Sequence, residues 1–116
     1  MRDVDLNRIR GLQLFAGMSD ARFTDATGGA FLQNFPANAT LLYEGDPVDF
    51  LYILLEGTVE LQGTWKDKES TLAILRPVST FILAAVVLDA NALMSARTLE
   101  KSQILMLSAE SLRRAM

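Results

Sequence analysis

The stretch LLYEGDPVDFLYILLEGTV, residues 41–59, contains two glycine turns on either side of a continuous apolar run. Gly45 lies in the first turn and Gly57 in the second, and glycine alone enters left-handed backbone conformations without a steric penalty. The run between the turns, residues 50–55, is too short to span a membrane. It is apolar at successive positions, which is typical of a strand buried on both faces. The stretch therefore predicts short strands joined by two sharp turns.

Short strand patterns continue on both sides of this stretch. Many short strands separated by regular turn signals are typical of a sandwich or barrel. A double-sheet jelly roll is one way in which such strands protect their edges. The sequence therefore predicts a mainly β fold, a double-stranded β-helix or jelly roll of about eight strands with short flanking helices. Further strands are expected at 31–35, 40–43, 59–62, 71–75, 95–100 and 103–107, with a charged hairpin loop at 66–69.

Helices are expected at the two ends of the chain, two before the first strand and one after the last. Ser19 and Ser108 are good N-caps, because their hydroxyls can accept a bond from a free amide in the first helical turn. The single domain, 1–116, divides into first helices (3–29), a β-roll (31–107) and the start of a C-terminal helix (108–116). This last helix reaches Met116 without a C-cap, which predicts that the natural chain continues.

The composition excludes several classes of function. The chain has 116 residues, enough for one core, and a formal charge of −3, which argues against direct binding of nucleic acid by this segment. It contains no cysteine and no histidine, so disulfides, Cys/His zinc sites and cysteine-held iron–sulfur clusters are excluded. The carboxylates Glu44 and Asp46 lie in a turn, where acidic residues are common for backbone reasons. We therefore do not expect an enzyme.

The sequence shows no pattern typical of a signal peptide or of a membrane-spanning helix. The N-terminal residues alternate charged and apolar types and lack the apolar centre of a signal peptide. The longest apolar run, residues 81–88, is far shorter than the roughly 20 residues of a membrane-spanning helix. We expect a cytoplasmic protein with no membrane partner.

Several segments together resemble a known family. In chain order they are Leu14-Phe15 before the Ser-capped helix, EGDPVDFLYILLEGTVEL (44–61), TLAILRP (71–77) leading to Phe81, SARTLE (95–100) and SQILML (102–107). This ordered set resembles the N-terminal, cyclic-nucleotide-binding-like sensor domain of the Crp/Fnr transcription regulators, over almost the whole chain. A cupin is another small jelly roll, but cupin metal sites are built on histidines. The resemblance implies an effector-sensing domain of a homodimer, which contacts DNA only through a helix-turn-helix domain that lies beyond this chain.

In members of this family that bind cyclic nucleotides, a Gly-Glu pair opens a short helix and an Arg-Ser-Ala triplet closes the phosphate-binding cassette. Helix amides and the arginine favour the phosphate, and the glutamate binds ribose hydroxyls. Carried over to this chain, the Gly-Glu pair corresponds to Ile82-Leu83 and the arginine to Met94. An unpaired phosphate in such an apolar corner would lose its hydration without compensation. The resemblance therefore implies a cassette that does not bind cyclic nucleotides.

Only the end of the triplet matches, at Ser95 and Ala96. Arg97 follows on the same strand face as Ser95, because side chains alternate along a strand, but it lies beyond the expected position. The candidate ligand-binding residues of this degenerate cassette are Ile82, Leu83, Ala84, Met94, Ser95, Ala96 and Arg97.

The apolar segment from Phe81 to Met94 leaves three hypotheses open. It could form a pocket for a hydrophobic ligand, since ligand sites are mostly apolar; it could fill the core, in a pseudo-sensor that serves only for docking or dimerisation; or it could hold haem, as in the nitric-oxide-responsive branch of the family. Haem needs an axial ligand. Without histidine and cysteine, the only candidates are Met18, Tyr43, Tyr52 and Met94. The effector itself is not identified by the sequence.

Overall fold

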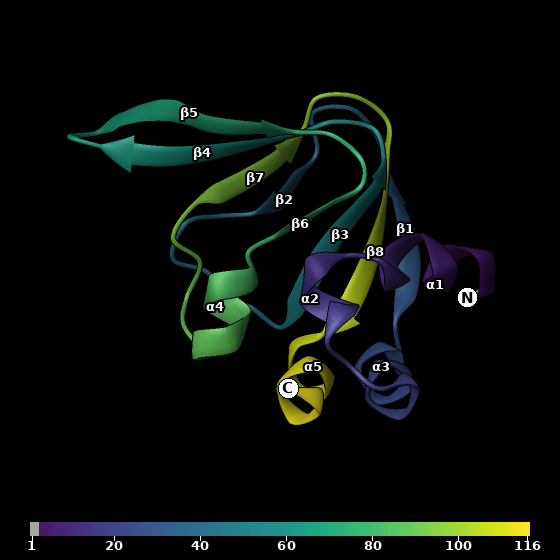
Figure 1. Cartoon of the computed structure of the whole chain (residues 1–116). Coiled ribbons are helices and arrows are strands. Elements are labelled where there is room, and N and C mark those ends of the chain that lie inside the picture. Colours follow the sequence, from purple (N-terminus) through teal and green to yellow (C-terminus); the bar gives the residue numbers. More distant parts are fainter. Residues whose placement is uncertain (1–2) are drawn as a thin grey trace.

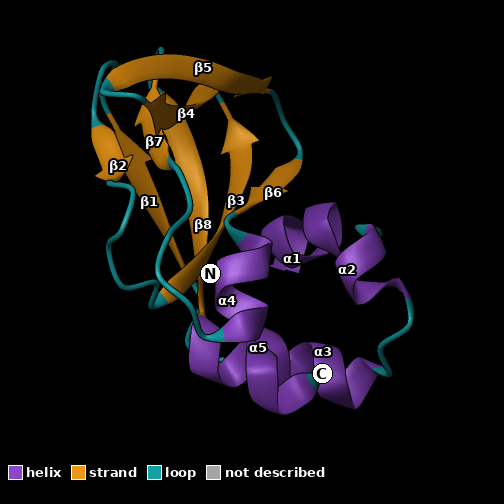
Figure 2. Ribbon diagram, turned by 90° about the vertical axis from the view of Figure 1, so that its left-hand side faces the viewer, coloured by secondary structure: helices purple, strands orange, loops and turns teal. Residues whose placement is uncertain are grey.

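The computed structural model describes residues 3–116, apart from the side chains of residues 3–5 and 65. Two four-stranded antiparallel sheets, with strand orders β1-β8-β3-β6 and β2-β7-β4-β5, pack into a β-roll. The helices gather at one side of this roll (Figures 1 and 2). The prediction of a mainly β jelly roll with short flanking helices is confirmed.

The strands are β1 (Phe31–Phe35), β2 (Thr40–Leu42), β3 (Phe50–Glu56), β4 (Val59–Trp65), β5 (Lys68–Leu75), β6 (Ser79–Phe81), β7 (Ser95–Thr98) and β8 (Ser102–Ser108). The helices are α1 (Asp3–Arg10), α2 (Gln13–Ala16), α3 (Asp20–Thr27), α4 (Leu83–Leu88) and α5 (Ala109–Ala115).

The core lies around β3 and β8, which pair in the middle of the first sheet. Residues 51–55 of β3 are all buried, as are residues 104–107 of β8. Burial at consecutive positions means that both faces of the sheet are covered, one by the second sheet and the other by the helices. This is the arrangement expected from the apolar run at 50–55. Each large side chain buried here contributes about 1.5–3 kcal/mol to folding.

Two turn glycines adopt the left-handed backbone that the sequence predicted, with φ of 91° at Gly45 and 100° at Gly57. They differ in their surroundings. A Cβ at Gly45 would have no atom within 4 Å, whereas a Cβ at Gly57 would lie 2.1 Å from Ser102 Oγ and 2.7 Å from Ser102 Cα. The hydroxyl of Ser102 is itself fixed, because it donates to Glu100 O at 2.8 Å. The β3–β4 turn therefore lies directly against the start of β8.

The N-terminal part contains three helices, not the two expected. The additional one is α2, formed by the apolar segment around Phe15, which is fully buried and meets Phe23 edge-to-face at 5.1 Å. Arg10 stabilises this short helix by donating to the carbonyl oxygens of Phe15 and Met18, at 2.6 and 2.8 Å. Tertiary contacts of this kind are not visible in local sequence periodicity.

The helix caps follow the prediction. Ser19 Oγ accepts from the amide of Arg22 at 3.2 Å at the start of α3, and Ser108 Oγ accepts from the amide of Ser111 at 3.3 Å at the start of α5. The charged hairpin is tighter than the expected loop at 66–69. Lys66 and Asp67 both have positive φ and form a two-residue turn, which is typical of a β-hairpin. Within residues 3–116, none of the helices has the length and apolar character needed to cross a bilayer.

Candidate functional site

The cassette, residues 82–97, connects β6 to β7 and contains α4 (Figure 1). It begins at Ile82, whose backbone is left-handed with φ of 69°. Such a conformation is an outlier for a β-branched residue and costs about 1–2 kcal/mol. The side chain of Ile82 is only 8% exposed, so its burial offsets this cost. The preceding residue, Phe81, stacks on Tyr52 with ring centroids 5.2 Å apart.

The helix of the cassette is apolar and joined to the core. Ala85 and Val86 are buried, Leu83 is half-buried against the core, and Ala84 is exposed. Asp89 is the single ionisable residue between positions 81 and 96. The segment between β6 and β7 therefore contributes no cation that could bind an anionic effector.

The loop after α4 is held by the turn at residues 43–46. The amide of Gly45 donates to Ala92 O at 2.8 Å, and the amide of Ala92 donates to Asp46 O at 2.9 Å. Ser95, the first matching residue of the triplet, accepts with its hydroxyl from the amide of Glu44 at 2.8 Å. This bond uses the Ser95 hydroxyl as a structural acceptor between β7 and the turn.

Met94 and Ala96 both contact the core. Met94 is half-buried and packs against the core residues, and Ala96 is completely buried. Ala96 pairs with Leu61 across β7 and β4, so these two residues lie on the core-facing side of the second sheet. The residues next to them in each strand must point to the other side.

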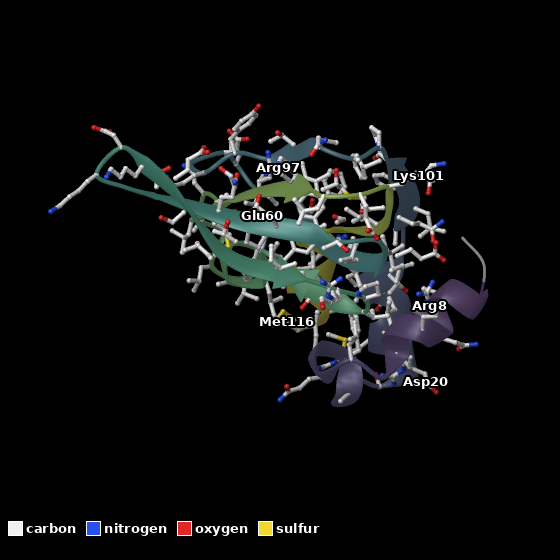
Figure 3. The ribbon with its side chains drawn as sticks, turned by 90° about the horizontal axis from the view of Figure 1, so that it is seen from above. Arg8, Asp20, Glu60, Arg97, Lys101 and Met116 are labelled. Atoms are coloured by element: carbon white, nitrogen blue, oxygen red, sulfur yellow. The ribbon has the colours of Figure 1, made fainter. Side chains whose placement is uncertain are left out.

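Arg97 lies on this opposite side, together with Glu60. The two residues are cross-strand neighbours, and Arg97 Nη2 donates to Glu60 Oε1 at 2.7 Å (Figure 3). The side chain of Glu60 is 11% exposed and that of Arg97 is 41% exposed, so solvent partly screens this ion pair. Ser95 and Arg97 therefore both point to the outer side of β7. Of the other predicted site residues, Ile82, Leu83, Met94 and Ala96 contact the core, and Ala84 is exposed.

Glu60 accepts two further hydrogen bonds, from the hydroxyl of Thr71 at 2.5 Å and from the side-chain amide Nε2 of Gln62 at 3.1 Å. The pKa of Glu60 is lowered from its ordinary value of 4.5, principally by the Thr71 hydrogen bond and secondly by the one from Arg97. Since nothing in the sequence connects Glu60 with Thr71 or Arg97, this cluster was missed by sequence reasoning.

The lowered pKa of Glu60 predicts how stability depends on pH. The unfolded chain takes up a proton at Glu60 before the folded chain does, so the stabilisation is fully present above pH 4.5 and is lost as the pH falls through the lower folded-state pKa. We expect Glu60→Gln to reduce the fall in unfolding free energy between about pH 5 and pH 3, measured by urea denaturation. Glu69→Gln, at an exposed residue of β5, is the control and should keep the native slope. A native slope in Glu60→Gln would contradict the assignment.

The C-terminal end of α4 is bonded to α5. Arg113 Nη1 donates to Val86 O at 2.8 Å and lies 3.7 Å from Asp89 Oδ1. A cation near the last carbonyls of a helix is favourable because these carbonyls lack intrahelical partners. Sequence reasoning missed Arg113, and no sequence signal relates it to α4.

The β-roll with a short helix between β6 and β7 is of the cyclic-nucleotide-binding type, which confirms the resemblance drawn from the sequence at the level of the domain. The model of one family, Cyclic nucleotide-binding domain, matches residues 32–116. This is most of the chain, and the chain therefore belongs to the cyclic nucleotide-binding domain family.

Individual relatives are regulators. The chain is similar to the global nitrogen regulator of Nostoc sp., with 36% identity over 63 residues, which is 51% of this chain and 28% of that protein. The chain thus aligns with only about a quarter of the length of this curated relative. Two structures share the fold. The sensor domain of the transcriptional regulator DNR from Pseudomonas aeruginosa has a TM-score of 0.87 at 22% identity, covering 97% of this chain and 77% of that one. The regulatory domain of Toxoplasma gondii PKA, crystallised with cAMP, has a TM-score of 0.92 at 15% identity, covering 100% and 46%.

Proposed function

We propose that the chain is the effector-sensing and dimerisation domain of a Crp/Fnr-type transcription regulator that does not respond to cyclic nucleotides. In this proposal the chain is cytoplasmic, is not an enzyme, and acts on DNA through a separate domain of a homodimer. The domain type and the similarity to the sensor domain of DNR and to the global nitrogen regulator support the regulatory role.

One observation supports the proposal that the chain does not bind cyclic nucleotides. The position that the resemblance assigns to the phosphate-binding arginine is Met94, and Arg97 is bonded to Glu60 on the outer face of the sheet. A phosphate in the cassette would therefore lose its hydration without gaining a cationic partner, which is strongly unfavourable. The glutamate that would bind the ribose is also replaced, by Leu83.

A docking or dimerisation module without a ligand is the second candidate. Leu88 at the end of α4 and Leu93 in the following loop are 72% and 70% exposed. Apolar side chains exposed close together in a chain are typical of surfaces that other protein segments cover. If this second function holds, the buried residues of the cassette only fill the core, and the exposed Leu88 and Leu93 contact another protein.

The residues present do not fit haem. Tyr52 is stacked on Phe81, and burial, with smaller contributions from Asp49 and Asp46, raises the pKa of its hydroxyl. A raised pKa disfavours the phenolate that would bind iron. Of the other candidates, Tyr43 is 63% exposed, and Met18 lies between α2 and α3, away from the cassette in the chain. Met94 lies in the cassette and packs against the core, but methionine ligates haem iron together with a histidine, and the chain has no histidine.

The test is titration of the purified chain with cAMP and cGMP in a calorimeter, together with a visible absorption spectrum. We expect no binding heat for either nucleotide and no strong visible band. Saturable binding of a cyclic nucleotide at micromolar concentration would contradict the proposal, and a strong visible band would show that the chain binds haem. Sedimentation at increasing concentration measures whether this segment associates by itself.

A further inference from the structure

A groove lies beside the cassette and shares Leu83 with it, between α2, the β5–β6 connection and the start of α4. Its volume is about 460 Å³, and its apolar wall consists of Leu12, Leu14, Leu75, Val78 and Leu83. These residues come from segments that are far apart in the sequence, and Figure 2 shows α2 and α4 on the same side of the strands. Sites for small molecules have volumes of about 300–1,000 Å³ and mainly apolar walls, so the groove has the size and the lining of such a site.

Three polar side chains complete the lining, Gln13, Ser79 and Thr80. Ser79 donates to Arg76 O, which leaves its lone pairs available. In the described part of the chain, the side chains of Gln13 and Thr80 have no hydrogen-bond partner. The groove thus offers an amide and two hydroxyls beside its apolar wall, in the proportion that fixes the orientation of a mainly apolar ligand.

The groove is also without charge, since none of its lining residues is ionisable. A charged ligand would lose hydration on entering and would find no opposite charge there. A neutral ligand would not have this cost, and its polar groups could bond with Thr80 and Gln13. We propose that this groove is a binding site for a neutral, mainly apolar small molecule that carries one or two hydrogen-bonding groups.

This site overlaps the cassette at one residue and does not depend on the proposed regulatory role. The two share only Leu83, the first residue of α4, which lines the groove and follows the left-handed Ile82. An occupant of the groove therefore touches the first turn of α4 from outside the cassette.

The test compares two fluorescent probes that differ only in charge. N-phenyl-1-naphthylamine is neutral, and 8-anilinonaphthalene-1-sulfonate is the same ring system with a sulfonate. We expect a saturable increase in fluorescence with the neutral probe and affinity at least about tenfold weaker for the sulfonate. Equal or tighter binding of the sulfonate, or no saturable binding of the neutral probe, overturns the proposal.

Substitutions locate the probe. Gln13→Trp fills the groove from an exposed position of α2, and Leu83→Gln makes its wall polar; each should weaken binding of the neutral probe by about tenfold or more. Leu93→Ser and Leu99→Gln change exposed leucines outside the groove and should bind the neutral probe as the native chain does.

Loss of probe binding in Leu93→Ser, with binding retained in the groove variants, would place the probe near Leu93 after α4 and overturn the proposal. Equal binding by all variants would also overturn it. Thermal unfolding of each variant verifies that it is folded.

Discussion

Replacing Gly57 with alanine is expected to destabilise the domain by about 3–5 kcal/mol, a large part of the roughly 5–15 kcal/mol that holds a domain of this size folded. The new methyl group would lie 2.1 Å from Ser102 Oγ and 2.7 Å from the Cα of the same residue. A hydroxyl can rotate, but a backbone Cα moves only with the whole start of β8. The melting temperature should therefore fall by about 15 °C, measured by calorimetry or circular dichroism.

Two other glycines separate the causes of this loss. Gly45→Ala has nearly the same positive φ but open space around the new methyl, so it should cost only about 1–2 kcal/mol from backbone strain. Gly17→Ala has φ of −93° and open space, and should be close to neutral. If Gly57→Ala and Gly45→Ala destabilise the domain equally, the close approach of Ser102 to Gly57 does not contribute to the loss. That result would contradict the described packing of the β3–β4 turn against β8.

The second large effect is a gain of cAMP binding when the cassette is rebuilt. The triple variant Ile82→Gly, Leu83→Glu, Met94→Arg introduces, at the positions that the resemblance implies, the residues that bind phosphate and ribose. Glycine also removes the left-handed strain at position 82. A paired, charge-assisted contact from the new arginine contributes about 1.5–3 kcal/mol. We expect calorimetry to show saturable cAMP binding at least about tenfold tighter than any binding by the native chain.

Controls for this variant test the role of each charge. The double variant that retains Met94 should not bind cAMP, and lysine at position 94 should bind more weakly than arginine because it lacks the planar fork. Replacing both Glu60 and Arg97 with glutamine in the rebuilt chain should leave its affinity unchanged, since this pair lies on the outer face of the sheet. Loss of binding on removal of that pair would show that Arg97 reaches the cassette after all.

Local chemistry explains why much of the fold was predictable. The turn glycines, the buried run of β3 and the serine caps of α3 and α5 are each specified by a few neighbouring residues, and each is found as expected. The helix α2 was not predicted, because its four residues are held by Arg10 and by the packing of Phe15 on Phe23.

The candidate site was less predictable for a related reason. Alternation correctly put Ser95 and Arg97 on one side of β7, but it could not say which side faces the core. That depends on the pairing of β7 with β4, which joins Arg97 to Glu60 across 37 residues of sequence. The same holds for the turn at 43–46, which fixes the loop after α4 through backbone bonds that no side-chain pattern reports.

The bond between Arg113 and Val86 O has a mechanical consequence. A short helix such as α4, fixed at one end to the guanidinium of α5, cannot shift alone without breaking a charge-assisted bond and exposing a carbonyl. Any displacement of α4 relative to α5 would therefore have to break or stretch the bond between Arg113 and Val86 O.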